Sequence, residues 1–303
     1  MKRIFLFLCI GLFIAGLFSC TSSAVLPYAS EEIGGSSVWK VTKGGNTLYL
    51  GGSIHLLRES DFPLPVEFDL AFSLSEILVL EADVEQMGNP EIIQYLLSKM
   101  FLPDDLTLRS VLEPQTYELL SAAFLEYYMP LEIYARFKPS MVVSVLSLMQ
   151  MQRLGFVEQG VDDYYLAKAK ENNMQILFLE SVESQIDIIV SMGDGYENEY
   201  VLYSLYDMDS VEEALDILVE DWRRGDRDIT ELSVLEMKES WPAIYKSLIT
   251  NRHDEWMPQI KNFLNSGKVY FIIAGNAHMH GPYGLINLLE EYGCKVEQLK
   301  VRP

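Results

Sequence analysis

Cysteine is scarce in this chain. The 303 residues include 3 cysteines, Cys9, Cys20 and Cys294. Cys9 and Cys20 belong to an apolar N-terminal stretch and its border, so Cys294 is the single thiol expected in the body of the chain. A cysteine-rich metal cluster and an intramolecular disulfide are therefore excluded.

Positive charge is also in short supply. The chain has 23 Lys and Arg against 44 Asp and Glu, which gives a net charge of −21 at pH 7. A surface of this sign repels phosphate backbones and anionic headgroups. We therefore expect no nucleic-acid partner and no direct adhesion of the folded body to anionic lipid.

Long apolar runs are missing everywhere except at the start. Lys2-Arg3 precedes the uncharged stretch from Ile4 to Phe18, which is shorter than the ~20 residues of a membrane-spanning helix and has the layout of a signal peptide over residues 1–19. Leu17-Phe-Ser-Cys20 resembles the lipobox of bacterial lipoproteins, which implies a lipid on Cys20, a membrane partner and an extracytoplasmic location in the cell envelope. An ordinary secretory signal or an uncleaved anchor also fits this stretch.

The remaining chain predicts a tether and one domain. Residues 20–37 are rich in Ser and Gly and read as a flexible tether, followed by a single domain over 38–303. Strands are expected at 38–42, 47–52, 77–80, 174–179, 269–275 and 294–301, and helices at 66–75, 140–154, 160–172, 285–292 and over most of 89–155 and 198–246. Apolar strands that alternate with helices predict an α/β fold with a mixed central sheet flanked by helices.

Candidate ligands follow several of these strands. His55 and His278 each lie three residues after a glycine, Gly52 and Gly275, and Glu81 and Glu180 directly follow two further apolar runs. In open α/β sheets the ligand crevice lies outside the carboxyl ends of the strands, so these side chains can converge. The glycines let the backbone turn and approach a ligand closely.

This donor set suits a divalent metal ion. Two imidazoles and a carboxylate are ligands for Zn²⁺, Mn²⁺, Co²⁺ or Fe²⁺, and a second carboxylate can act as a general base. Arg252 can hold an oxyanion or a substrate carboxylate. Structural roles also fit each residue: a hydrogen-bonded histidine, a capping glutamate, or an arginine paired with surplus acids. We expect His280 in the first turn of a helix and His253 as a solvated residue at a helix start.

An ordered set of motifs resembles the TraB/PrgY/GumN family, related to the Tiki metalloproteases. The motifs are Gly52-Ser-Ile-His55, Phe62-Pro-Leu-Pro65, Leu80-Glu81, Gln159-Gly-Val-Asp162, Leu179-Glu-Ser-Val-Glu-Ser-Gln185, Asn251-Arg252 and Ala274-Gly-Asn-Ala-His278, with Gly281 and Gly284. The similarity runs from about Val38 to Leu299. The chain departs from the common pattern with Ser53 in place of Thr, and with Asn276-Ala277 where Ala-Gly is frequent.

The resemblance implies a fold shared with the erythromycin esterases and ChaN-like proteins. Tiki proteins are membrane-tethered peptidases that depend on Mn²⁺ or Co²⁺, and PrgY-like members limit peptide pheromone signalling. By position, His55, His278 and Glu81 become metal ligands or catalytic groups, supported by Glu180 and Arg252. Neither departure touches these residues.

Three functions remain open at this level. The leading hypothesis is a lipid-anchored, metal-dependent hydrolase, a peptidase that acts on extracytoplasmic peptides with Mn, Co or Zn. A second is a binding protein without catalysis that sequesters a peptide, haem or metal in the same crevice. A third is a metal-independent hydrolase of the erythromycin esterase type, in which His55 activates water directly.

Overall fold

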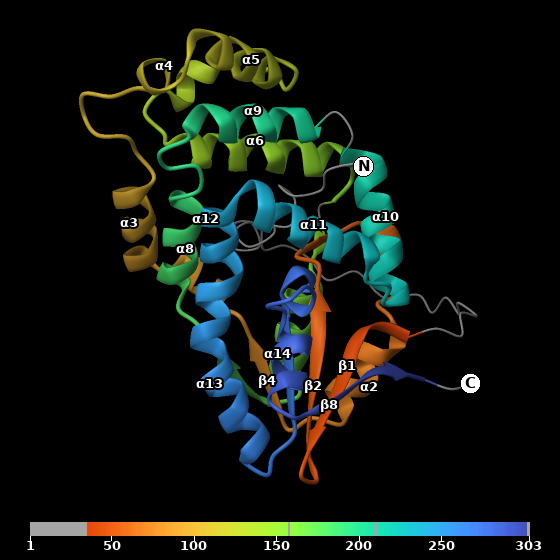
Figure 1. Ribbon diagram of the computed structural model, residues 1–303. Coiled ribbons are helices and arrows are strands. Elements are labelled where there is room, and N and C mark those ends of the chain that lie inside the picture. The colour runs from red at the N-terminus through yellow and green to blue at the C-terminus, as the bar shows by residue number, and fades with distance from the viewer. Residues whose placement is uncertain (1–34, 157, 209–210, 302–303) are drawn as a thin grey trace.

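A mixed sheet forms the lower half of the molecule (Figure 1). The computed structural model describes residues 35–156, 158–208 and 211–301, so the predicted signal peptide and lipidated Cys20 lie outside the described residues. Six strands are hydrogen-bonded in the order β6-β4-β7-β2-β1-β8. Their bounds are β1 Gly35–Lys43, β2 Asn46–Ser53, β4 Ile77–Leu80, β6 Gln175–Phe178, β7 Tyr270–Gly275 and β8 Lys295–Lys300.

Strand direction divides the sheet into two parts. The four strands β6, β4, β7 and β2 run parallel, whereas β1 is antiparallel to both β2 and β8. β1 and β2 form a hairpin whose turn contains Gly44 and Gly45, both with positive φ. The mixed α/β sheet predicted from the sequence is confirmed.

The central strands are apolar because helices cover both of their faces. Along β7, Tyr270, Ile272 and Ala274 pack toward α13 (Asn251–Asn265) and α14 (Leu285–Glu291). The alternate residues Phe271 and Ile273 pack toward α2 (Val66–Ser73) and α7 (Val161–Glu171). Strand side chains alternate between faces, so a strand buried on both sides shows no polar alternation.

A helical layer covers the end of the sheet toward which β2 points (Figure 1). Its helices are α3 (Pro90–Lys99), α4 (Leu108–Val111), α5 (Pro114–Leu125), α6 (Pro139–Arg153), α8 (Val182–Val190), α9 (Glu197–Met208), α10 (Val211–Arg224), α11 (Asp228–Ser240) and α12 (Pro242–Tyr245). Pro90, Pro114 and Pro139 each occupy the first turn of a helix, where the missing N–H of proline has no intrahelical partner to lose. Buried residues of this layer form a core of their own.

The N-terminal boundary differs from the prediction. β1 begins at Gly35, so residues 35–37 of the expected tether are strand, and Ser36 and Ser37 are 0% exposed. Gln298 of β8 donates a hydrogen bond to the Ser36 carbonyl at 3.1 Å, which fixes this start against the last strand.

None of the described helices combines the length and apolar character that a bilayer crossing requires.

Candidate functional site

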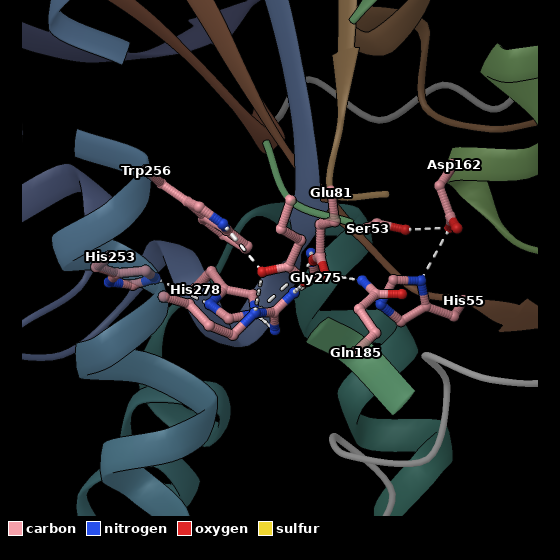
Figure 2. Close-up of polar contacts among 11 residues, drawn as sticks. Ser53, His55, Glu81, Asp162, Gln185, His253, Trp256, Gly275 and His278 are labelled. Carbon is pink, nitrogen blue, oxygen red and sulfur yellow. Dashed lines mark hydrogen bonds and ion pairs between the residues drawn. The ribbon is translucent and has the colours of Figure 1, made fainter. Parts of the chain in front are cut away.

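The four predicted strand-end residues meet at one edge of the sheet. β2 and β7 are neighbours in parallel register, with Ser53 opposite Gly275, so the two Gly-x-x-His steps lie side by side. β4 pairs with β7 and with β6, and the pairing continues past the strands because the Glu180 N–H donates to the Glu81 carbonyl at 2.9 Å. Figure 2 shows the resulting cluster.

Gly275 marks the centre of this cluster. A Cβ atom on Gly275 would lie 3.2 Å from Nε2 of His55, 3.4 Å from Oε1 of Glu81 and 3.5 Å from Cδ2 of His278. Three polar side chains that follow three different strands therefore surround one point. The point stays open because residue 275 is glycine and has no Cβ atom there. The absence of a side chain at Gly275 is what leaves room for these three groups to lie so close to one another. Gly52 has a different neighbour, since a Cβ there would lie 2.1 Å from Oδ1 of Asn276.

Arg252 of α13 joins three of the predicted residues. Its guanidinium donates to Glu180 at 3.0 Å from Nε and 2.7 Å from Nη2, and Nη2 also donates to Oε2 of Glu81. Nη1 lies 2.8 Å from Nε2 of His278. The side chain is 3% exposed and stacks on Trp256, with Cζ 4.4 Å from the ring centroid. A planar guanidinium can bridge two carboxylates in this way, whereas a lysine ammonium cannot.

The two glutamates have different surroundings. Glu81 accepts hydrogen bonds from the Gly275 N–H at 2.6 Å and from Gln185 at 3.3 Å, so Oε1 is held toward the Gly275 point. Glu180 accepts the Trp256 indole N–H at 3.1 Å as well as Arg252. Burial raises the pKa of Glu180, and the charge of Arg252 opposes that rise. Glu81 therefore faces the open point, while Glu180 fixes the arginine.

His278 is held in one tautomer by the groups at both ends of a hydrogen-bonded chain. Nδ1 of His253 lies 2.6 Å from the Tyr283 carbonyl, which only accepts, so this nitrogen carries the proton. Nε2 of neutral His253 then accepts from Nδ1 of His278 at 2.9 Å, and Nε2 of His278 accepts from Arg252. Burial and the nearby Arg252 lower the pKa of both histidines, that of His253 to about 4. His278 thus presents a lone pair on Nε2.

Two histidine predictions are wrong. His253 lies at the start of α13 as expected, but it is 0% exposed rather than solvated, because α13 turns it inward together with Trp256. His280 is not in a helix: it caps the short 3-10 helix Asn276–Met279 in extended conformation and packs edge-on against Trp39, with ring centroids 5.5 Å apart.

His55 has an acidic partner that the sequence analysis placed only in a motif. Its Nδ1 lies 3.1 Å from Oδ1 of Asp162, which also accepts from the Ser53 hydroxyl at 2.6 Å. Burial by itself lowers the pKa of His55, but the charge and hydrogen bond of Asp162 outweigh it and raise the pKa to about 9. Because Nδ1–H is donated to Asp162, Nε2 is the nitrogen that faces Gly275.

A two-residue ladder brings Asp162 to His55. β3 (Leu56–Leu57) pairs with β5 (Glu158–Gln159), and the Val161 N–H donates to the Ile54 carbonyl at 3.0 Å. A Cβ on Gly160 would lie 2.4 Å from the His55 carbonyl oxygen, so only glycine permits this approach. The motif Gln159-Gly-Val-Asp162 therefore positions a carboxylate against the first histidine.

We expect Asp162→Asn to lower the pKa of His55 markedly. In the native protein the pKa is about 9, above the ordinary 6.5. Protonated His55 thus stabilises the fold fully below about pH 6.5, and this stabilisation is lost as pH rises through about 9. The variant should therefore lose more stability at pH 6 than at pH 9.5, measured by urea unfolding, with the His55 pKa followed by NMR. Asp216→Asn, which removes an exposed partner of Arg58, is the control and should leave the His55 pKa unchanged.

The donor atoms of His55 and His278, and the tautomers in which these rings are held, are those that a transition-metal ion requires. His55 and His278 present Nε2 lone pairs when neutral, and their Nδ1–H groups are held by Asp162 and His253, as outer-shell partners of metal-bound histidines are. In the arrangement described, Arg252 holds Nε2 of His278. No group of three or more His, Cys, Asp or Glu side chains in the described part of the chain is spaced to hold an ion. Binding would thus require His278 to exchange Arg252 for the ion.

The fold and site define an α/β protein with a buried histidine, glutamate and arginine cluster at the carboxyl edge of its parallel strands. The chain belongs to the TraB/PrgY/gumN family, whose family model matches residues 37–298. Comparison with curated proteins and with solved structures gave no match.

Two of the residues that depart from the common family pattern, Ser53 and Asn276, make side-chain hydrogen bonds. Ser53 donates to Asp162, and Asn276 donates from Nδ2 to the Thr230 hydroxyl at 3.1 Å. Asp162, His253 and Trp256 are site residues that the sequence analysis missed. The sequence did carry a signal for His253 and Trp256: Trp256 lies four residues after Arg252 and three after His253, the spacings that place side chains on one face of a helix, and α13 buries all three.

Proposed function

We propose that this protein is a hydrolase, a metal-dependent peptidase of the Tiki type, that acts on extracytoplasmic peptides. The observation that carries the proposal is the convergence on Gly275, where His55 Nε2, Glu81 Oε1 and the His278 ring lie 3.2, 3.4 and 3.5 Å from one point. Preorganised polar groups around a small open space are what hydrolysis of a carbonyl compound needs.

In this proposal His55, His278 and Glu81 hold a divalent ion, with Mn, Co or Zn as candidates. When bound, the ion would lower the pKa of water and polarise the scissile carbonyl. Asp162 orients His55 and His253 orients His278 through the hydrogen bonds described above. Once released from His278, Nη1 of Arg252 can donate to a developing oxyanion, while Glu180 keeps the guanidinium in place.

A lipid anchor would determine where this chemistry takes place. We propose that Cys20 is acylated and holds the protein on a membrane of the bacterial cell envelope, outside the cytoplasm. The support is the Leu17-Phe-Ser-Cys20 sequence after an apolar run.

A metal-independent hydrolase is the second candidate. The contact that favours it is the 2.8 Å approach of Arg252 to Nε2 of His278, which occupies the lone pair that an ion would need. A hydrolase of this kind should keep its activity in the presence of a chelator. The binding alternative would retain a ligand unchanged, although the cavities at the site, about 50 and about 20 Å³, are far below the several hundred Å³ that a cofactor such as haem occupies.

Metal content and peptide cleavage test the proposal together. Purified full-length protein should contain about one divalent ion per chain and cleave members of a peptide mixture when Mn²⁺, Co²⁺ or Zn²⁺ is supplied. His55→Ala and His278→Ala should lose the ion and lower cleavage by about 100-fold or more, because each removes a group at the reaction centre.

His280→Gln is the matched control. His280 is buried two residues beyond His278 but packs on Trp39 and lies outside the cluster, so its variant should keep metal and activity if folded. A native protein that retains no ion and cleaves no peptide with any of the three metals would contradict the proposal.

A further inference from the structure

An apolar cavity lies directly against the site. It has a volume of about 50 Å³ and is bordered on one side by His55, Gly275 and His278. A second part of the lining, the apolar wall, comes from the helical layer: Met151 of α6, Phe156, and Leu215, Leu218 and Val219 of α10. The reacting groups and an apolar recess thus share one space.

The wall offers no hydrogen bonds to a guest. Met151, Phe156, Leu215, Leu218 and Val219 are all buried, with exposures from 1% to 6%. No Lys, Arg, Asp or Glu side chain in the described part of the chain lines this cavity. Against this wall a charged or amide group would lose its bonds to water without replacement, whereas an aliphatic group would gain by leaving water. The polar lining residues, Ser53, His55, Asn276 and His278, all belong to the strand-end side of the cavity.

Volume limits the guest further. The cavity of about 50 Å³ exceeds the ~10–15 Å³ that one buried water molecule needs and is well below the ~150 Å³ of a cavity that admits benzene. A methyl, ethyl or isopropyl group fits, and an aromatic ring does not. The second cavity, of about 20 Å³, also borders His55 but is lined by Glu81, Asp162 and Gln185 and suits a water molecule.

We propose that the larger cavity is a specificity pocket that receives a small aliphatic side chain of the peptide next to the scissile bond. The inference rests on the proposed function, because the pocket selects substrates for the same reaction centre. Val and Ala side chains suit its volume and chemistry. Leu218 and Val219 of α10 set the depth of the pocket and act as specificity-determining residues.

Cleavage profiling of a peptide mixture with the full-length chain and Mn²⁺ tests this pocket. The native protein should cleave beside Ala and Val at least about 10-fold faster than beside Phe or Lys, because one methylene too many in a fixed apolar pocket costs 10-fold or more in kcat/KM. Leu218→Ala should shift the preference toward Leu and Phe by a similar factor. Leu289→Ala removes the same atoms from a fully buried leucine of α14 that does not line the pocket, and should leave the preference unchanged.

The outcomes separate this inference from the proposed function. No cleavage of any peptide by the native protein with Mn²⁺, Co²⁺ or Zn²⁺ would remove both. Cleavage without an aliphatic preference, or a preference that Leu218→Ala leaves in place, would overturn the pocket alone. If Leu218→Ala does not fold, Val219→Ala and Leu218→Val enlarge the same pocket by less. An unchanged cleavage preference in both of these variants would count equally against the pocket.

Discussion

Arg252→Met is expected to destabilise the protein by about 3–5 kcal/mol, because it leaves buried carboxylates without their cation. The side chains of Arg252, Glu81 and Glu180 are 3%, 6% and 3% exposed, so water cannot replace the guanidinium. Methionine fills much of the arginine volume, so the cost arises chiefly from charge and hydrogen bonding rather than from a cavity. Urea unfolding at pH 7 measures the difference.

The loss should depend on pH in a defined direction. Burial raises the pKa of Glu180 and Arg252 opposes the rise, so removing Arg252 raises this pKa further. An acid whose folded pKa exceeds its unfolded value favours the folded state at low pH and loses that contribution as pH rises. The deficit of Arg252→Met should therefore be smaller near pH 4 than near pH 7.

Two further substitutions control this experiment. Arg252→Lys keeps the charge but cannot bridge both carboxylates, and should fall between the native protein and Arg252→Met. Arg153→Met removes an arginine whose side chain is 52% exposed and whose Nη1 lies 3.5 Å from Oε2 of Glu126. Loss of this exposed ion pair should change the free energy of unfolding by about 0.5 kcal/mol or less. An Arg252→Met variant as stable as Arg153→Met at pH 7 would show that the buried ion pairs do not form.

Gly275→Ala is expected to lower activity severely while the protein stays folded. Gly275 has φ −48° and ψ 138°, a conformation that alanine adopts without strain. The added methyl would occupy the point 3.2 Å from Nε2 of His55 and 3.4 Å from Oε1 of Glu81, where the proposed reaction takes place. We expect cleavage to fall by about 100-fold or more, since displacements of about 1 Å in a reacting site have effects of that size.

Gly51→Ala is the comparison that distinguishes a methyl group placed in the site from a methyl group placed in the hydrophobic core. A Cβ on Gly51 would lie 2.9 Å from two ring carbons of Phe271, in the packed face between the sheet and α2. This variant should lose stability yet keep the site geometry in the molecules that remain folded. Thermal unfolding and peptide cleavage, measured on both variants, should give opposite patterns. Full activity in Gly275→Ala would place the reaction elsewhere.

The sequence was sufficient to predict the sheet and the edge at which its polar residues gather. Apolar runs such as Tyr270–Gly275 can be buried on both faces only within an α/β sheet, and parallel strands place their carboxyl ends together. Local signals therefore determined which residues lie near the site. They did not determine which residues touch, because contact depends on strand order.

The partners of the two histidines show this limit. His55 and Asp162 are separated by 107 positions, and only the short β3 and β5 ladder brings them together. His253 was expected to be a solvated residue at the start of a helix. Burial instead follows the side of α13 that packs on the sheet, and Arg252 and His253 both belong to that side.

The pairing of the first strand with the last affects how the domain bears load. β1 lies between β2 and β8, and its start is fixed by Gln298 of β8. Hydrogen bonds between antiparallel strands are perpendicular to the strands, so a pull applied ahead of Gly35 along β1 would shear many bonds at once instead of unzipping them singly. A pull on the N-terminal segment would thus be resisted by two neighbouring strands, and it would enter the sheet at the edge where His55 lies, because Val38 of β1 pairs with Gly51 of β2.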